Sequence, residues 1–446
     1  MLRPQPSATA PSWCRRAPIH ARSLLTNRIS SRTITLVSWI LLAAPFVIYS
    51  LCIVRYATNV PFQDDYDAAL DFANTFLHLH KPLEQIALLF SQHNEHRIVL
   101  DRVVFLSSYY LVHAVNFKLS ILIGNLGWIL TPAMLVAYFH KKCHLSLAHL
   151  LPIPYLLLSF THWENMFFAM AAIQNYWFIF FSLAFIICLS EHKPLWFCTL
   201  FPIALFTSGG GIVLYPLGNL FLVLRRKWRS FGWFFALSTS CMLLYSYHYH
   251  KTPHHPSILG ALLTPLKTGA YFFYFWGNMA PFEHVPLLIG IVLCLLSFYL
   301  VIRRYGSSFF RLAMGFIALI AITATLTRSG IGTRQALSSR YSLFPLIGMA
   351  CVYACISIAI AKRVAIHRAF SVCAVLGAIS YWGIVGLRTE HNGFFQQLKS
   401  ERIASVVAFS QGDRGSLLYP DRDRAAHILQ DAEQAHIYHC GNVERR

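Results

Sequence analysis

Charged side chains are scarce in this 446-residue sequence. Only 12% of the residues are Asp, Glu, Lys or Arg, which is about half the share in an average soluble domain. In contrast, 56% are hydrophobic and 15% are aromatic. So little charge cannot cover a soluble globule of this length, which excludes disordered, collagen-like, coiled-coil and soluble enzyme folds. Apolar runs near the ~20 residues that cross a bilayer recur from residue 33 to residue 387. The composition therefore predicts an all-α, polytopic integral membrane protein.

Several common catalytic and metal-binding patterns are also missing. The sequence has no HExxH motif, no nucleotide-binding glycine fingerprint and no Ser/His/Asp signature. Its eleven cysteines show no zinc-type spacing, and most lie in or beside apolar runs, where they act as small hydrophobic residues. The net charge of +19 would suggest nucleic acid in a soluble protein. In a membrane protein, Lys and Arg instead gather in cytoplasmic loops, so we expect no nucleic-acid partner.

The apolar runs predict about 11–13 transmembrane helices. Two stretches, 98–117 and 258–280, are apolar but contain ionisable residues such as Asp101 and Lys267. We interpret both as re-entrant or juxtamembrane helices, and they raise the number to thirteen only if they cross. The eleven firmer spans are 33–54, 119–139, 145–160, 168–190, 195–208, 211–224, 231–249, 285–302, 308–326, 342–361 and 366–387.

Basic residues between the spans predict the orientation. If the tail over residues 1–32 is cytoplasmic, every short basic loop also faces the cytoplasm, as the positive-inside rule requires. Of the eighteen acidic residues, only Glu191 then faces inward. A simple explanation of this asymmetry is that the outer segments are the longest polar segments. The sequence thus predicts a multi-pass protein of the bacterial inner membrane, with a transmembrane domain over 33–387 and a small periplasmic segment over 388–446.

The first predicted outer loop, residues 55–97, is acidic. Asp64, Asp65, Asp67 and Asp71 fall within eight residues, soon after the first span. Apolar residues at helical spacing follow them and predict two short amphipathic juxtamembrane helices. Carboxylates at the membrane boundary suit removal of a proton from an acceptor hydroxyl, or binding of Mg²⁺ or Mn²⁺ beside a phosphate. The alternative is a solvated acidic turn that caps a helix.

The same loop ends in Glu95-His96-Arg97, shortly before the ionisable residues Asp101 and Arg102. Ionisable residues next to apolar segments usually face a cavity or pair with one another. We therefore expect Glu95, His96 and Arg97 to contact a substrate. A salt-bridge cluster that anchors the loop is the alternative interpretation.

A late outer loop, residues 327–341, breaks the positive-inside pattern because it carries Arg328, Arg334 and Arg340. The guanidinium group is well shaped for bidentate contact with phosphate. We expect these arginines, with Tyr341, to bind a lipid-linked phosphate. Contact with anionic membrane lipid, or pairing with the acids of the first loop, would also explain them.

Two further outer turns carry weaker signals. Trp163 and Glu164 lie in a polar cluster in which an aromatic ring stands beside hydrogen-bonding groups, and we consider them sugar-binding candidates. The turn at residues 207–211 contains three consecutive glycines. Irregular backbone at membrane depth is tolerated where it lines a cavity or is buried, and close packing is the simpler interpretation of these glycines.

The order of these elements resembles the GT-C superfamily of membrane glycosyltransferases. The acidic pair after the first membrane helix corresponds to Asp64-Asp65, and the turn Ser208-Gly-Gly-Gly-Ile-Val-Leu-Tyr-Pro216 is similar to the family's small-residue turn before a proline-containing helix. The segments PFQDDYD and QHNEHR also resemble parts of bacterial membrane proteins of this type. One departure is that the second acidic position is often Glu in the family and is Asp65 here, so the resemblance leaves open which Asp acts.

The resemblance implies transfer of a sugar from a polyprenyl-phosphate carrier to a glycan, lipid or protein acceptor at the periplasmic face. Asp64 or Asp65 would be the general base, and Arg334 and Arg340 would stabilise the leaving phosphate. A divalent cation would assist in some family members. A lipid-linked glycan polymerase or ligase, or a flippase-type transporter, is the alternative.

Overall fold

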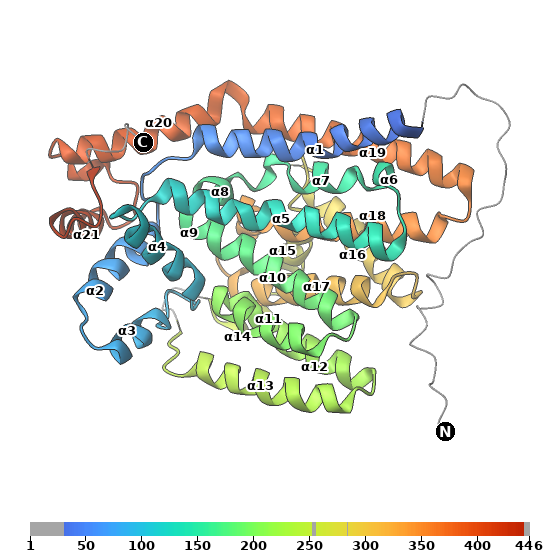
Figure 1. Cartoon of the computed structure of the whole chain (residues 1–446), viewed down its shortest axis with the longest axis horizontal. Coiled ribbons are helices and arrows are strands. Elements are labelled where there is room, and N and C mark those ends of the chain that lie inside the picture. The colour runs from blue at the N-terminus through green and yellow to red at the C-terminus, as the bar shows by residue number, and fades with distance from the viewer. Residues whose placement is uncertain (1–30, 252–255, 283, 441–446) are drawn as a thin grey trace.

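The computed structural model describes residues 31–251, 256–282 and 284–440. Within these ranges the chain is all-α and contains no strand (Figure 1), which confirms the predicted fold class. Most of the predicted cytoplasmic tail, residues 1–30, lies outside the described residues.

Six helical segments of the described chain are long and apolar enough to cross a membrane, so the chain is a multi-pass membrane protein. Three other apolar segments are shorter: α11 (Pro194–Thr207), the segment Gly209–Leu224 and α16 (Pro286–Ile302). The number of long spans is thus below the eleven to thirteen predicted. The six are Leu36–Tyr56 in α1, Phe117–Cys143 (α5), Ala169–Ser190 (α9, η3 and α10), Ser308–Arg328 (α17), Ser339–Ile360 (η6 and α18) and Val364–Ser410 (α19, η7 and α20).

The predicted span at 145–160 is not one helix. It consists of two short helices, α6 (Leu147–Leu150) and α7 (Pro152–Leu157), because prolines near this junction lack the N–H that would continue a single helix. The stretches 98–117 and 258–280 form α4 (Val99–Val112), α14 (Ile258–Leu262) and α15 (Pro265–Gly277). Each of these helices is shorter than a bilayer requires.

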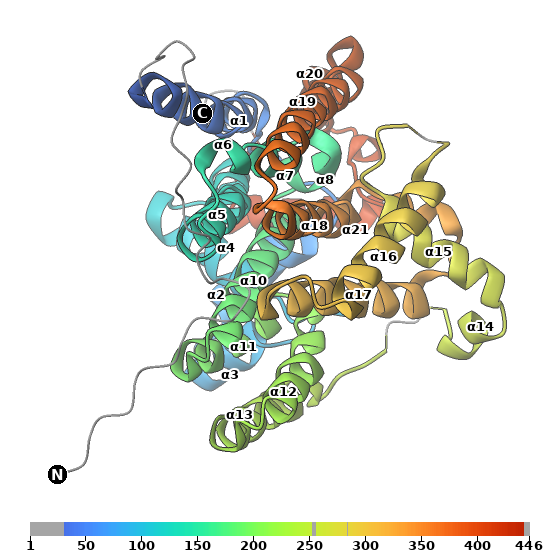
Figure 2. The same ribbon diagram turned by 90° about the vertical axis from the view of Figure 1, so that its right-hand side faces the viewer.

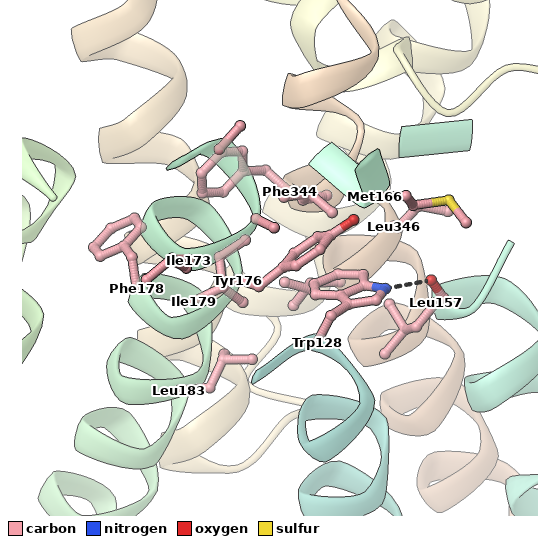
Figure 3. Close-up of a cluster of buried hydrophobic side chains, with 14 of the residues drawn as sticks. Trp128, Leu157, Met166, Ile173, Tyr176, Phe178, Ile179, Leu183, Phe344 and Leu346 are labelled. Atoms are coloured by element: carbon pink, nitrogen blue, oxygen red, sulfur yellow. Dashed lines mark hydrogen bonds between the residues drawn. The ribbon is translucent and has the colours of Figure 1, made fainter. Parts of the chain in front are cut away.

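The packed core lies where α5, α10 (Phe178–Ser190) and α18 (Leu343–Ile360) meet, and Figure 2 shows these helices surrounded by the others. Trp128 of α5 is fully buried, and its indole N–H donates to the carbonyl of Leu157 at 2.9 Å. Its ring stacks on Tyr176 with 5.3 Å between centroids (Figure 3). Gly124 allows the close approach of α5 to α9 (Ala169–Ala172), since a Cβ at position 124 would lie 2.6 Å from the Ala172 side chain.

The basic loops predicted to be cytoplasmic lie together at one end of the bundle. Lys142 and Lys193, from two different loops, each approach Glu191 at 2.9 Å. Arg225 donates to Ser308 Oγ at 2.5 Å and so joins two further loops. The opposite end holds the acidic loop and the C-terminal helix (left in Figure 1). Its helices are α2 (Phe72–His78), α3 (Pro82–Leu89), α4 and α21 (Arg422–Gln434).

The C-terminal segment packs closely on the first loop. Helix α21 contacts the π-helix η1 (Tyr66–Asp71), and the Tyr438 hydroxyl donates to the carbonyl of Asn59 at 2.7 Å. The N–H of Val115 donates to the carbonyl of Ile437 at 2.8 Å. The segment 388–446, which was predicted as a small appendage, therefore forms part of the same packed end of the molecule over its described residues.

Candidate active site

A cavity of about 580 Å³ lies at the end of the bundle that carries the acidic loop. This volume is within the range of small-molecule sites. Segments far apart in the sequence form its wall: the first loop, the glycine-rich turn, the segment after α13 (Trp228–Ser246), and the region from the end of α17 (Ser308–Arg328) to α18. Of the candidate residues, the cavity brings together Asp64, Glu95, His96, Arg328, Arg340 and Tyr341.

The two adjacent acids Asp64 and Asp65 have different environments. Asp64 lines the cavity, and no hydrogen bond engages its carboxylate among the described residues. Asp65 is 1% exposed and does not line the cavity. Its two oxygens accept the N–H groups of Met170 at 2.9 Å and Phe62 at 3.1 Å. Asp65 therefore fixes the loop to α9 (Ala169–Ala172), while Asp64 is open to a ligand.

The charge state of Asp64 depends on its surroundings. Burial raises the pKa of this carboxyl above its usual value, while the nearby Arg340 guanidinium acts to lower it. A carboxyl whose pKa is raised from 3.8 is a stronger base than an exposed aspartate. Asp64 thus combines access to the cavity with increased basicity, as a general base requires.

His96 is held as a neutral imidazole by the glycine-rich turn. The N–H of Gly209 donates to its Nδ1 at 3.0 Å, so in the neutral ring the hydrogen is on Nε2. Burial lowers the pKa of His96 to about 4. A Cβ at position 209 would lie 2.7 Å from Nδ1, so glycine is required for this contact. The turn that we expected to serve close packing therefore also lines the cavity, through Ser208, Gly209 and Gly210.

Two arginines enter the cavity from the late outer loop. Arg328, at the end of α17, forms an ion pair with Glu95 of the first loop. Arg340 is half-exposed and lies near both Asp64 and Glu164, with its Nε 3.8 Å from the Glu164 carboxylate. Acids that follow the first helix and arginines that precede α18 thus meet around one cavity.

Other candidate residues lie outside the cavity wall. Asp67 is bound by Arg424 and by the Tyr419 hydroxyl, and Arg97 donates to main-chain carbonyls, including that of Tyr245 at 2.8 Å. Trp163 packs its ring edge-on against Phe394, with 4.9 Å between centroids. Glu164 accepts hydrogen bonds from serines of the late loop, and Arg334 is exposed.

Main-chain hydrogen bonds of two arginines anchor the end of the first loop, in addition to the ion pair of Glu95 with Arg328. Arg97 and Arg102 both bind main-chain carbonyls, and Arg102 reaches those of Leu88, Leu89 and Ser91 at 2.7–2.9 Å. These bonds fix the end of α3 and the turn that follows it. The arginines thereby hold Glu95 and His96 in place at the cavity.

The described residues contain no group of three or more His, Cys, Asp or Glu side chains that would hold a metal ion. Asp64 and Asp65 do not form a pair of ligands, because both oxygens of Asp65 accept main-chain hydrogen bonds. A Mg²⁺ or Mn²⁺ ion at this place would have Asp64 as a protein ligand and would take further oxygens from a substrate phosphate.

Several residues of the wall were not predicted as site residues. Gln174 and Asn175 lie in the π-helix η3 (Ile173–Trp177), and Tyr249 and Lys251 follow α13. Lys251 had a usable signal, because it is a basic residue in a loop predicted to face outward. Gln174 and Asn175 belong to the same polar outer cluster as Trp163 and Glu164, which is a weak signal for sugar contact. Tyr249 follows no sequence pattern that singles it out.

One wall of the cavity is apolar. Ile320, Phe344 and Phe275 line it from α17, α18 and α15. At its edge, Ile212 and Ile258 line the cavity and are also 38% and 53% exposed. The apolar lining therefore continues onto the apolar outer surface of the bundle.

No family model, no curated protein and no solved structure matches this chain.

Proposed function

We propose that this protein is a membrane glycosyltransferase that moves a sugar from a polyprenyl-phosphate carrier to a hydroxyl of a cell-envelope glycan, lipid or protein. The observation that carries the proposal is the meeting of Asp64, Arg328 and Arg340 in one cavity at the end of the bundle away from the basic loops. If those loops are cytoplasmic, the cavity faces the periplasm of a bacterial inner membrane.

The proposed step is an inverting displacement at the anomeric carbon of the sugar. The acceptor oxygen forms a bond to this carbon while the bond from the carbon to the phosphate oxygen breaks. Asp64 takes the proton of the acceptor hydroxyl, and the polyprenyl phosphate leaves with the electron pair. Arg340 and Arg328 stabilise the negative charge that develops on the phosphate.

The mixed polar and apolar lining of the cavity supports a lipid-linked donor. Carboxylate, amide and imidazole groups at Asp64, Gln174, Asn175 and His96 suit the hydroxyls of a sugar, and the apolar wall suits a hydrocarbon chain. The exposed edge at Ile212 and Ile258 gives such a chain a continuous path to the surrounding lipid.

The test compares two arginines of the same loop. Membranes containing the protein are incubated with a panel of polyprenyl-phosphate sugars, and the release of free polyprenyl phosphate is measured by mass spectrometry. Arg340→Gln is expected to lower the rate by about 10²-fold, the loss typical when one group that stabilises transition-state charge is removed. Arg334→Gln, in the exposed part of the loop, is expected to lower it much less. Equal losses, or no release by the wild-type protein, would contradict the proposal.

The rate is expected to fall at low pH because Asp64 acts as a carboxylate. Its pKa is raised by burial and lowered by Arg340, so the rate is present above this raised pKa and is lost as the pH falls through it. In Arg340→Gln the lowering influence is removed, and the acidic limb of kcat against pH is expected to move to higher pH. Titration of His96 adds no limb to this pH profile near pH 6.5, because burial lowers the pKa of His96 to about 4. A limb at an unchanged pH in Arg340→Gln would argue against Asp64 as the base.

A further inference from the structure

Glu164 lies behind the cavity wall and contacts the late loop at several points. Its Oε2 accepts hydrogen bonds from the hydroxyls of Ser338 at 3.0 Å and Ser339 at 2.8 Å. Its main-chain N–H donates to Ser339 Oγ at 3.2 Å. One residue of α8 (Trp163–Phe167) thus fixes both residues that precede Arg340.

The backbone around Arg340 is fixed from two further directions. The Asn165 amide donates to the carbonyl of Arg340 at 3.3 Å, and Asn165 itself accepts a hydrogen bond from Asn175 at 2.8 Å. The Asn278 amide donates to the carbonyl of Ser338 at 2.7 Å. Residues of α8 and the residue that ends α15 therefore fix the position of this short turn.

The Glu164 carboxylate also lies beside the Arg340 side chain. The Arg340 Nε lies 3.8 Å from the Glu164 carboxylate, while Arg340 itself lines the cavity and influences the Asp64 carboxyl. The arginine side chain has four rotatable bonds and loses substantial entropy when it is fixed. A carboxylate beside its Nε leaves the terminal nitrogens to face a ligand.

We infer that Glu164 is a positioning residue that holds Arg340, through the Ser338-Ser339 turn and the contact to Nε, in the orientation that binds the donor phosphate. The inference rests on the proposed function. It differs from the sequence-based interpretation of Glu164 as a sugar contact, since Glu164 does not line the cavity.

The test uses farnesyl phosphate, which has the phosphate and isoprenoid chain of the donor class and no sugar. Its binding to the full-length protein in detergent is measured by titration calorimetry. Glu164→Gln is expected to weaken binding by about three- to tenfold, as expected when a charge-assisted contact is lost. In an Arg340→Gln background, the same substitution is expected to have no further effect, because there is no guanidinium left to position.

Two other variants complete the experiment. Ser338→Ala combined with Ser339→Ala frees the turn and leaves the Glu164 carboxylate in place, and it is expected to weaken binding in the same direction. Glu84→Gln changes an exposed acidic residue of α3 that pairs with Lys81 at 2.9 Å. This variant is expected to bind farnesyl phosphate like the wild type.

The outcomes separate the two proposals. If the wild type does not bind farnesyl phosphate, the proposed function fails and the inference fails with it. If Arg340→Gln loses binding while Glu164→Gln binds like the wild type, the positioning inference alone is wrong. It is also wrong if the losses of Glu164→Gln and Arg340→Gln multiply in the double variant, because Glu164 would then act independently of Arg340.

Discussion

Asp64→Asn is expected to lower the rate of sugar transfer by about 10²- to 10⁴-fold, the contribution of a positioned general base. The amide keeps the size of the side chain and cannot accept the proton of the acceptor hydroxyl. Because Asp64 lines the cavity and no hydrogen bond engages its carboxylate among the described residues, the folded state is expected to remain nearly as stable as that of the wild type. The measurement is the release of polyprenyl phosphate by protein inserted at equal amounts.

Asp65→Asn is the matched comparison. Its amide has one oxygen to accept the two main-chain N–H groups that both carboxylate oxygens now bind. Leaving one buried donor unsatisfied costs about 1–3 kcal/mol, so this variant should mainly lose stability and keep more activity per folded molecule. If Asp65→Asn proved to be the less active of the two, Asp64 would not be the base.

Arg402→Met is expected to lower the free energy of unfolding by about 1–3 kcal/mol, the cost of leaving a buried hydrogen-bonding group without its partner. Arg402 is 2% exposed. It donates to the carbonyl of Phe167, lies near Asp65, and has its guanidinium carbon 4.0 Å from the centre of the Phe62 ring. Methionine preserves much of the volume but leaves the buried Phe167 carbonyl without its hydrogen-bond donor.

The control for this variant is Arg424→Met, in the same C-terminal segment. Arg424 pairs with Asp67, but its side chain is 55% exposed, and exposed ion pairs contribute about 0–1 kcal/mol. Resistance of the detergent-solubilised protein to unfolding in urea would rank the variants. A loss in Arg424→Met as large as that in Arg402→Met would show that burial of Arg402 has no special importance.

The fold class could be predicted from the sequence, and so could much of the approach of acidic and basic residues at the cavity. Both depend on strong local signals. Apolar runs predict membrane helices, and the excess of Lys and Arg in some loops indicates which loops share a side. Asp64 and Arg340 could be expected near each other because they carry opposite charges in two loops that are both predicted to face outward. The break at Pro152 was missed because the run around it has the composition of a span.

The roles within the acidic loop could not be predicted. Asp64 and Asp65 are the same residue type at adjacent positions, and only the packing of α9 against the loop shows which one is buried. Arg402 is distant in sequence from Asp65, and nothing in the segment 388–446 indicates that it contacts the first loop. Such contacts depend on the tertiary fold and leave no periodic pattern in the sequence.

The bond from Tyr438 to Asn59 joins residues 379 positions apart. During synthesis, the early acidic segment therefore leaves the ribosome long before the residues that brace it exist. Until the last helix has been inserted and the segment around Tyr438 has reached the same side of the membrane, the first loop of the nascent protein would lack these contacts. Packing of the first loop is thus tied to synthesis of the segment around Tyr438, at the other end of the sequence.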